Sequence, residues 1–259
     1  MRRFSADYLR RTRDGMWADE REALADLELP ACDRILDVGC GEGALTRVLW
    51  EECPGEVVGC DHDAALLAEL DGPTVRGDVY HLPFRDDAVD LVVCQALLVN
   101  LPEPRRAVRE IARVASNRVA CVEPDNGRVS VRSTVEAEPG LAARARDRYL
   151  EGADTDVALG DDAAGLLRAA GLSNVRTTRY DRTLVVEPPY SKSEVQAVGR
   201  KAYADGLRAR RATMTGTEEE LDALRSEWRS MGREAARQLR AGEYRREETV
   251  PFYATVGEV

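Results

Sequence analysis

The chain has 259 residues, enough for one large α/β domain with an elaboration or two small domains; 44% are hydrophobic and 32% charged, which indicates a folded protein rather than a disordered one. The formal net charge at pH 7 is −10, from 37 basic and 47 acidic residues, which disfavours general binding to nucleic acid phosphates. No apolar run approaches the roughly 20 residues that span a bilayer, and the first residues lack the apolar core of a signal peptide, so we expect a cytoplasmic protein.

The first 30 residues combine basic and aromatic side chains. They include Arg2, Arg3, Arg10, Arg11 and Arg13, with Tyr8 and Trp17 interleaved. This combination occurs in nucleic-acid-binding segments. Because the segment is short and the whole chain is acidic, we predict instead a helical flap over residues 1–30, ahead of a main domain over 31–259.

Between residues 33 and 123, strand and helix patterns alternate, which is typical of a parallel sheet with crossover helices. The expected strands are 34–38, 56–60, 74–76, 89–94 and 118–123. The expected helices are 45–52, 64–70 and 104–115, the first two ending at Pro54 and at Gly72-Pro73.

The second half of the chain has a looser pattern. Residues 124–161 show no clear element, a helix is expected at 163–170, and a sixth strand at 175–186. A helical insertion follows at about 191–242, where Ser191 with Glu194 and Thr217 with Glu220 have capping-box spacing. The last expected strand is 249–256, in which Pro251 suits an edge or a bulge.

Apolar residues recur at helical spacing in the second inserted helix, and Gly242 follows as a C-cap. They are Leu221, Leu224, Trp228, Met231, Ala235 and Leu239. One face of this helix must therefore be buried. Two interpretations stay open: packing on the sheet domain, and a cover over a substrate pocket.

Six cysteines and two histidines show no spacing typical of a metal site. The sequence holds no C-x-x-C pair, and His62 and His81 have no matching partner nearby. Several of the cysteines lie in or beside expected buried strands, so we predict reduced core residues and no metal.

The most informative segment is 35–43, ILDVGCGEG, a buried-strand pattern that runs into a glycine-rich turn and then a helix. Gly39, Gly41 and Gly43 let the backbone pass close under a ligand, and the helix start offers free N–H groups. Such a turn is typical of a nucleoside-containing cofactor.

Two kinds of cofactor compete for this turn. Gly39, Gly41 and Ala44 satisfy the dinucleotide pattern G-x-G-x-x-A, as in an NAD(P)-dependent oxidoreductase. Asp37, however, would bring a negative charge to the place of the pyrophosphate. A cofactor with an ammonium and a sulfonium group but no phosphate tolerates that charge. With Asp37, the segment resembles motif I of the class I S-adenosylmethionine-dependent methyltransferases, and the small-molecule, quinone-methylating branch is the most similar.

The ends of the next two strands extend this resemblance. Asp61 ends the second strand, 22 residues after Gly39, where a carboxylate can bind ribose hydroxyls. His62 follows, either against the adenosine or facing solvent. The sequence Gly77-Asp78-Val79, with Leu82-Pro83-Phe84 after it, is similar to the family pattern G-D-A-x-x-L-P-F. The resemblance implies that Asp78 binds the adenine amino group and that the Val79 N–H meets a ring nitrogen.

The resemblance continues after the fourth strand, where Gln95 is the candidate contact to the methionine part of the cofactor. Candidates for accepting or orienting a proton are Glu123 or Asp125 after the fifth strand, Asn100 where many relatives have histidine, and Tyr8 from the flap. The predicted cofactor-binding residues are Asp37, Gly39, Cys40, Gly41, Asp61, His62, Asp78, Val79 and Gln95.

The resemblance implies an α/β fold: a Rossmann-like, seven-stranded mixed sheet in the order 3-2-1-4-5-7-6, with helices on both faces, an antiparallel last strand and the helical insertion between the sixth and seventh strands. It implies S-adenosylmethionine as cofactor and in-line methyl transfer to a small-molecule or lipid-like acceptor. Alternatives are an RNA or protein methyltransferase, a non-catalytic S-adenosylmethionine-binding protein and, less favoured, the NAD(P) oxidoreductase. The sequence leaves the oligomeric state open, a homodimer included.

Overall fold

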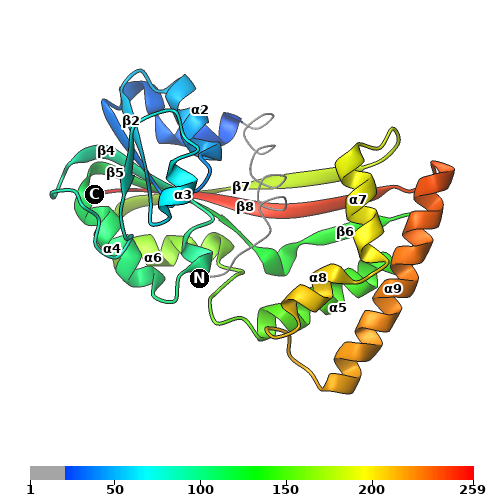
Figure 1. Cartoon of the computed structure of the whole chain (residues 1–259). Helices are drawn as coiled ribbons and strands as arrows, with labels where there is room; N and C mark the ends of the chain where they lie inside the picture. The colour runs from blue at the N-terminus through cyan, green and yellow to red at the C-terminus, as the bar shows by residue number, and fades with distance from the viewer. Residues whose placement is uncertain (1–20) are drawn as a thin grey trace. The chain divides into compact units, whose positions relative to one another are not determined.

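The computed structural model describes residues 21–259, so Tyr8 and most of the predicted flap lie outside the described residues. The described chain begins with two 3-10 helices, η1 (Arg21–Leu27) and η2 (Leu29–Ala31). It divides into two compact units (Figure 1). Unit 1 holds the described residues up to 125, with 159–182 and 251–259, and unit 2 holds 126–158 and 183–250.

Unit 1 is built on a mixed sheet whose order agrees with the prediction. Its parallel strands are β1 (Arg34–Val38), β2 (Glu56–Asp61), β3 (Thr74–Arg76), β4 (Val89–Gln95) and β5 (Ala115–Pro124). The order is β3-β2-β1-β4-β5-β8, in which β8 (Arg246–Glu258) pairs antiparallel with β5, and β7 (Ser173–Val186) pairs with β8. Since β7 and β8 are the sixth and seventh predicted strands, both the predicted order and the antiparallel last strand are confirmed.

The helices of unit 1 lie on both sides of the sheet, as predicted. They are α2 (Ala44–Glu52), α3 (Ala64–Leu67), α4 (Pro104–Val114) and α6 (Ala163–Ala169), with single 3-10 turns η3 (Leu98–Asn100) and η5 (Gly160–Asp162). Pro104 begins α4, where its missing N–H costs nothing. Figure 1 shows α4 and α6 on one side of the strands and α2 on the other. Helices α4 and α6 bury Ile111 and Leu167 in the same core as Val92 and Val119.

Strand β8 changes its partner at Pro251. The strand is flanked by β5 and β7 in unit 1. Its residues 246–249 pair with β6 (Ser130–Ser133), and residues 252–258 pair with β5. Pro251 falls between these two partners, where no N–H is needed for a ladder. Strand β6 is also the eighth strand of the described sheet, where seven were predicted.

Unit 2 contains helices α5 (Glu138–Glu151), α7 (Lys192–Lys201), α8 (Asp205–Arg210) and α9 (Glu218–Ala241), with β6, η4 (Asn126–Arg128) and the adjoining parts of β7 and β8. Both predicted capping boxes are present, at the starts of α7 and α9, and Gly242 ends α9 in the left-handed conformation. The sequence predicts no element at 130–133 or 138–151, because neither segment has a strong apolar period. Unit 2 is therefore larger than the predicted insertion at 191–242.

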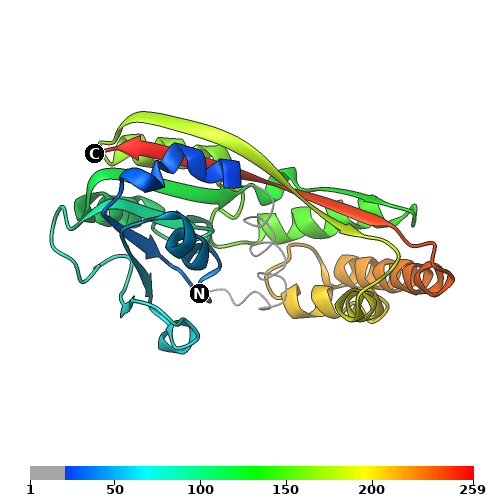
Figure 2. The same ribbon diagram turned by 90° about the horizontal axis from the view of Figure 1, so that it is seen from above.

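The apolar face of α9 packs inside unit 2, against α5 and α7. Leu224, Met231 and Ala235 share a core with Leu141 of α5 and Val198 of α7. Figure 2 shows α9 beside α7. The two helices approach closely at Gly232, where a Cβ atom would lie 2.3 Å from the carbonyl carbon of Lys201. Neither interpretation of this face from the sequence anticipated α5 as its partner.

A buried ionic network ties the helices of unit 2 to its strands. Glu138 of α5 is 1% exposed, and its carboxylate accepts hydrogen bonds from Ser133 Oγ at 2.7 Å and Tyr244 Oη at 2.9 Å. Lys201 pairs with the same carboxylate, and Arg246 Nε lies 3.1 Å from it. Burial alone would raise the pKa of Glu138, but Lys201 and Arg246 hold that pKa below its usual value. The network joins α5, α7, β6 and β8 through one carboxylate.

Lys201 makes the stability of this network depend on pH. Burial, with Arg246 nearby, lowers the pKa of its ammonium group to about 8 in the folded chain. As the pH rises above 8, the folded state releases this proton before the unfolded state does, so the free energy of unfolding rises. We expect the wild type to gain about 2 kcal/mol relative to K201M between pH 7 and pH 10. Urea unfolding of both proteins across that range measures the difference, and parallel pH profiles would contradict the assignment.

Candidate cofactor site

Four buried polar side chains lie toward the carboxyl ends of neighbouring strands. Asp37 in β1, Asp61 in β2, Gln95 in β4 and Glu123 in β5 are each at most 8% exposed. The strands stand in the order β2-β1-β4-β5, so these side chains belong to one edge of the sheet. Open α/β sheets bind their ligands at this edge, and burying polar groups is costly unless they are hydrogen-bonded.

The glycine turn between β1 and α2 has a backbone that other residues adopt only with strain. Gly39, Gly41 and Gly43 all have positive φ, at 73°, 55° and 79°. A Cβ atom on Gly39 would lie 2.8 Å from Leu97 Cδ1. The N–H groups of Gly39 and Cys40 both donate to the carbonyl of Cys60, at 2.7 and 3.1 Å, which holds the turn against β2.

Asp61 connects this turn to the end of β2. Its Oδ2 accepts the Gly41 N–H at 2.9 Å, and its Oδ1 accepts the Asp63 N–H at 2.9 Å. His62 is half-exposed, and its Nδ1 lies 2.9 Å from Asp61 Oδ1. The structure therefore brings together Gly41, Asp61 and His62, three of the predicted cofactor-binding residues.

Asp37 has a partner that sequence reasoning missed. It is 1% exposed, and its Oδ2 accepts a hydrogen bond from Thr46 Oγ1 at 2.6 Å. This bond ties β1 to the first turn of α2 across the glycine turn. Thr46 is fully buried. It lies within the expected helix 45–52, but the sequence indicated no role for it. The feature that could have indicated this role is a hydroxyl side chain in the first turn of a helix that follows a buried carboxylate.

Glu123 holds the segment that follows β4. Its side chain is fully buried, with Oε1 accepting the N–H groups of Leu97 at 3.1 Å and Leu98 at 2.9 Å. Its Oε2 accepts the Val99 N–H at 3.3 Å. With both oxygens engaged in this way, the geometry favours an anchoring role, and proton transfer by Glu123 stays a prediction.

Asn100 and Ala96 complete this segment. Ala96 follows Gln95 with a φ of 48°, which is strained for a residue with a side chain. Asn100 Nδ2 donates to the Ala96 carbonyl at 2.8 Å. Asn100 Oδ1 is buried and has no hydrogen-bond partner among residues 21–259. Nothing in the sequence marks Ala96 as strained.

The remaining predicted residues lie after β3 and β5. Asp78 Oδ1 accepts the Tyr80 N–H at 2.9 Å, and Val79 packs partly buried against the core of unit 1. His81 is exposed, with its Nε2 2.6 Å from an Arg106 nitrogen. Asp125 is 6% exposed, and its N–H donates to the Pro251 carbonyl at 3.0 Å.

Within residues 21–259, no group of three or more His, Cys, Asp or Glu side chains is arranged to hold a metal ion. The same residues contain no helix that is both long and apolar enough to cross a membrane.

Comparison with known families agrees with this geometry. A family profile described as "Methyltransferase domain" matches residues 36–122, which include the glycine turn, the strands β2, β3 and β4, and parts of β1 and β5. Residues 36–122 therefore belong to a methyltransferase domain, similar to those of the class I S-adenosylmethionine-dependent enzymes. Its cofactor is S-adenosylmethionine, and the positive-φ turn with buried carboxylates beside it fits a ligand that has an ammonium group and a ribose but no phosphate. The profile match favours a methyltransferase domain over the NAD(P) alternative.

Two curated relatives are similar to part of this chain. Demethylmenaquinone methyltransferase of Lactiplantibacillus plantarum is 34% identical over 118 residues, covering 40% of this chain and 50% of the relative. Trans-aconitate 2-methyltransferase of Variovorax paradoxus is 33% identical over 125 residues, covering 45% of this chain and 48% of the relative. The chain thus spans about half the length of these relatives.

The fold extends beyond the matched sequence. The crystal structure of an S-adenosylmethionine-dependent methyltransferase from Archaeoglobus fulgidus aligns with 99% of this chain and 100% of its own, with a TM-score of 0.55 and 13% identity. At that identity, the likeness shows a shared fold alone.

The anchoring role of Glu123 predicts a loss of stability in E123Q. An amide can accept with one side only, so at least one of the three N–H donors loses its partner and the buried charge disappears. We expect the free energy of unfolding to fall by about 2–4 kcal/mol. Urea unfolding measures this, with E69Q on the exposed surface of unit 1 as the matched control, expected within about 0.5 kcal/mol of wild type. Equal stability of E123Q and E69Q would contradict the anchor.

Proposed function

We propose that the chain is an S-adenosylmethionine-dependent methyltransferase that acts on a small-molecule or lipid-like acceptor by in-line methyl transfer. The observation that carries this proposal is the glycine turn held by Asp61, inside a methyltransferase domain and beside three further buried polar side chains. An intact turn of this kind supports cofactor binding. The methyl transfer and the class of acceptor are proposed in addition to cofactor binding.

The cofactor contacts follow from the edge of the sheet. We assign the backbone of Gly39, Cys40 and Gly41 to contacts with the methionine part of S-adenosylmethionine. The glycines have no side chains that would keep the cofactor away from this backbone. Asp61 would accept hydrogen bonds from the ribose hydroxyls, since its Oδ2 has lone-pair capacity beyond the Gly41 N–H. His62, next to Asp61, would lie against the adenosine.

Three further residues complete the proposed cofactor contacts. Asp78 would accept from the adenine amino group, the Val79 N–H would donate to a ring nitrogen, and Gln95 would contact the methionine end. Asp37 is buried behind the turn with Thr46, so its contribution would come through the turn's shape and its negative charge.

S-adenosylmethionine supplies a methyl group that its sulfonium already activates for displacement. The chain's own task is therefore to align donor and acceptor and to exclude water, which in favourable cases lowers a barrier by about 7–11 kcal/mol. Glu123 would serve this alignment by fixing residues 97–99. Asn100, held by its bond to Ala96, would orient an acceptor hydroxyl or amine.

The acceptor class is inferred from two observations. Demethylmenaquinone methyltransferases and a trans-aconitate 2-methyltransferase, both named for small or lipid-like acceptors, are among the relatives. The net charge of −10 disfavours RNA as the acceptor. A protein acceptor and a non-catalytic S-adenosylmethionine-binding protein are the alternatives that experiment has to separate.

Incubation with donor labelled in the methyl group and with fractionated cell extract tests the proposal. Label in the small-molecule or lipid fraction is expected. Label in RNA or protein would overturn the acceptor class, and tight cofactor binding with no labelled fraction would favour the non-catalytic alternative.

Cofactor binding by itself is tested with D61N. The amide cannot accept at both positions, so it loses a ribose contact together with a bond that holds the turn. We expect the affinity for S-adenosylhomocysteine to fall at least about tenfold, as for a charge-assisted bond left unmade. Isothermal titration calorimetry measures it, with D71N, an exposed residue of unit 1, as the control that keeps wild-type affinity. Unchanged affinity in D61N would remove Asp61 from the site.

A further inference from the structure

Strand β7 forms an edge of the described sheet. It pairs with β8, and within residues 21–259 no other strand pairs with it. Hydrogen bonds between Thr177 and Thr255 at 3.0 Å and between Thr183 and Thr249 at 2.9 Å fix an antiparallel register on β8. Figure 1 shows β7 on the side of β8 that faces away from β6. In an antiparallel pair every second residue directs its N–H and C=O groups away from the partner, so β7 has a row of backbone donors and acceptors at this edge.

This edge lacks the features with which proteins usually block edge strands. From Val175 to Val186 the strand contains no proline, glycine or lysine and no residue with positive φ. No residue of β7 is buried, whereas β8 is buried from Val250 to Gly257. Val185 is 40% exposed, which is unusual for a large apolar side chain in the described part of this chain. An edge of this length and composition is suited to pairing with a further strand.

The side chains of β7 are arranged symmetrically about Tyr180. One face of the strand carries, in order, Val175, Thr177, Arg179, Asp181, Thr183 and Val185. Reversing this order exchanges valine with valine, threonine with threonine, and arginine with aspartate. A second copy of β7, related by a two-fold axis at Tyr180, would therefore place each of these side chains opposite an identical or an oppositely charged one.

The two charged residues on this face select one register. Arg179 and Asp181 are 50% and 48% exposed and pair within the strand, with Arg179 Nε 2.7 Å from Asp181 Oδ1. Across a two-fold axis at Tyr180, each would also face the opposite charge of the second copy. A residue that points toward the partner strand must face another that does so, which means that the axis can move only by whole residues. Moving it to Arg179 or to Asp181 would place like charges directly opposite each other, which is destabilising.

We propose that two copies of this chain form a symmetric dimer by antiparallel pairing of their β7 strands over residues 175–185, with Tyr180 at the two-fold axis. The backbone at the edge supplies the hydrogen bonds, and the charged pair supplies the register. Because the two β7 strands run in opposite directions, the carboxyl ends of the parallel strands point in opposite directions in the two copies, and each copy keeps its own cofactor edge. This inference goes beyond the proposed function and does not depend on it.

Sedimentation velocity of the full-length protein over a range of concentrations tests the dimer. The wild type should show an equilibrium between monomer and dimer. R179D would bring four carboxylates together across the axis, and D181R would bring four guanidinium groups together. We expect each variant to weaken dimerisation at least about tenfold, because two attractive cross-strand contacts become repulsive.

Mixing the two variants separates the contact between copies from the ion pair within the strand. Neither R179D nor D181R retains the ion pair within the strand. One copy of each, however, restores opposite charges at both contacts between the strands. An equimolar mixture should therefore form a mixed dimer at least about tenfold more tightly than either variant alone.

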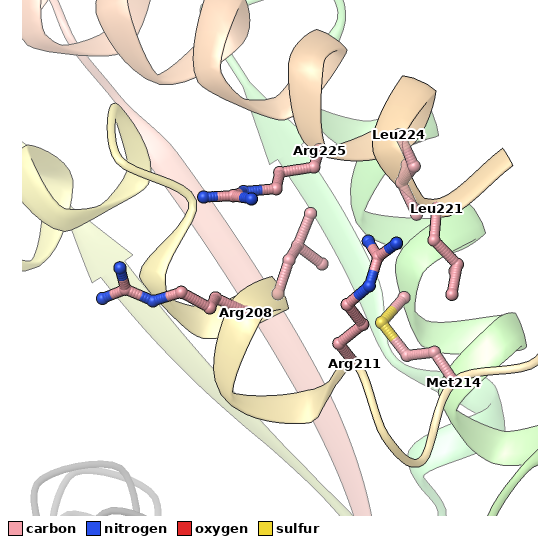
Figure 3. A pocket seen from close by; sticks show the side chains of 7 residues that line it. Arg208, Arg211, Met214, Leu221, Leu224 and Arg225 are labelled. Carbon is pink, nitrogen blue, oxygen red and sulfur yellow. The ribbon is translucent and has the colours of Figure 1, made fainter. Parts of the chain in front are cut away.

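Arg208 of α8 provides a matched control outside β7. Its side chain is 66% exposed and pairs with Asp205 of the same helix at 2.9 Å. Figure 3 shows its guanidinium group pointing away from Met214 and Leu221, so its replacement leaves these apolar side chains in place. R208D makes the same change of charge as R179D and also loses an ion pair within one element. Its dimer dissociation constant should stay within about twofold of wild type.

Three results would overturn the proposal. A wild type that stays monomeric throughout the concentration range would show that the β7 edge does not pair. Equal dimerisation of R179D, D181R and the wild type would place the interface elsewhere. A mixture no more dimeric than its two components would exclude the register about Tyr180, and since it compares the same two proteins alone and together, lower stability of either variant cannot imitate its result. No measurement uses the cofactor, so failure here leaves the methyltransferase proposal untouched.

Discussion

The bond from the Gly41 N–H to the Asp61 carboxylate is the contact on which the cofactor edge of unit 1 depends. It fixes a turn whose three glycines have left-handed backbone and little intrinsic preference for one conformation. The carbonyl of Cys60 accepts two more hydrogen bonds from N–H groups of the turn. Three hydrogen bonds from the turn to the end of β2 therefore fix the position of the turn. A shape complementary to a ligand is thereby fixed before the ligand arrives, which reduces the ordering cost of binding.

Buried carboxylates perform the same kind of task at three places in this chain. Asp61 holds the glycine turn, Glu123 holds the segment after β4, and Glu138 holds the helices and strands of unit 2 together. In each case at least one donor comes from a segment distant in sequence, and the charge strengthens each bond. Glu138 also pairs with two basic side chains, Lys201 and Arg246, so ion pairs contribute to its network.

The sequence was most informative where structure follows from local rules. Continuous apolar runs predicted β1, β2 and β4, and capping boxes located the starts of α7 and α9, because both signals arise from neighbouring residues. It failed for α5, whose burial depends on α9, a helix far along the chain. At the cofactor site, the residues of the sequence motifs could be predicted, because they follow one another along the chain. The strain at Ala96 and the hydrogen bond from Thr46 to Asp37 could not, because they arise from packing between separate segments.

All six cysteines are free, buried and confined to unit 1. Burial raises the pKa of the Cys32, Cys40 and Cys60 thiols, and only the thiolate form reacts readily with alkylating reagents. In the folded chain these thiols are doubly protected, by access and by protonation, so modification reports local or global opening. Unit 2 has no cysteine and gives no signal. Alkylation of the cysteines therefore reports the opening of unit 1 and does not report the opening of unit 2.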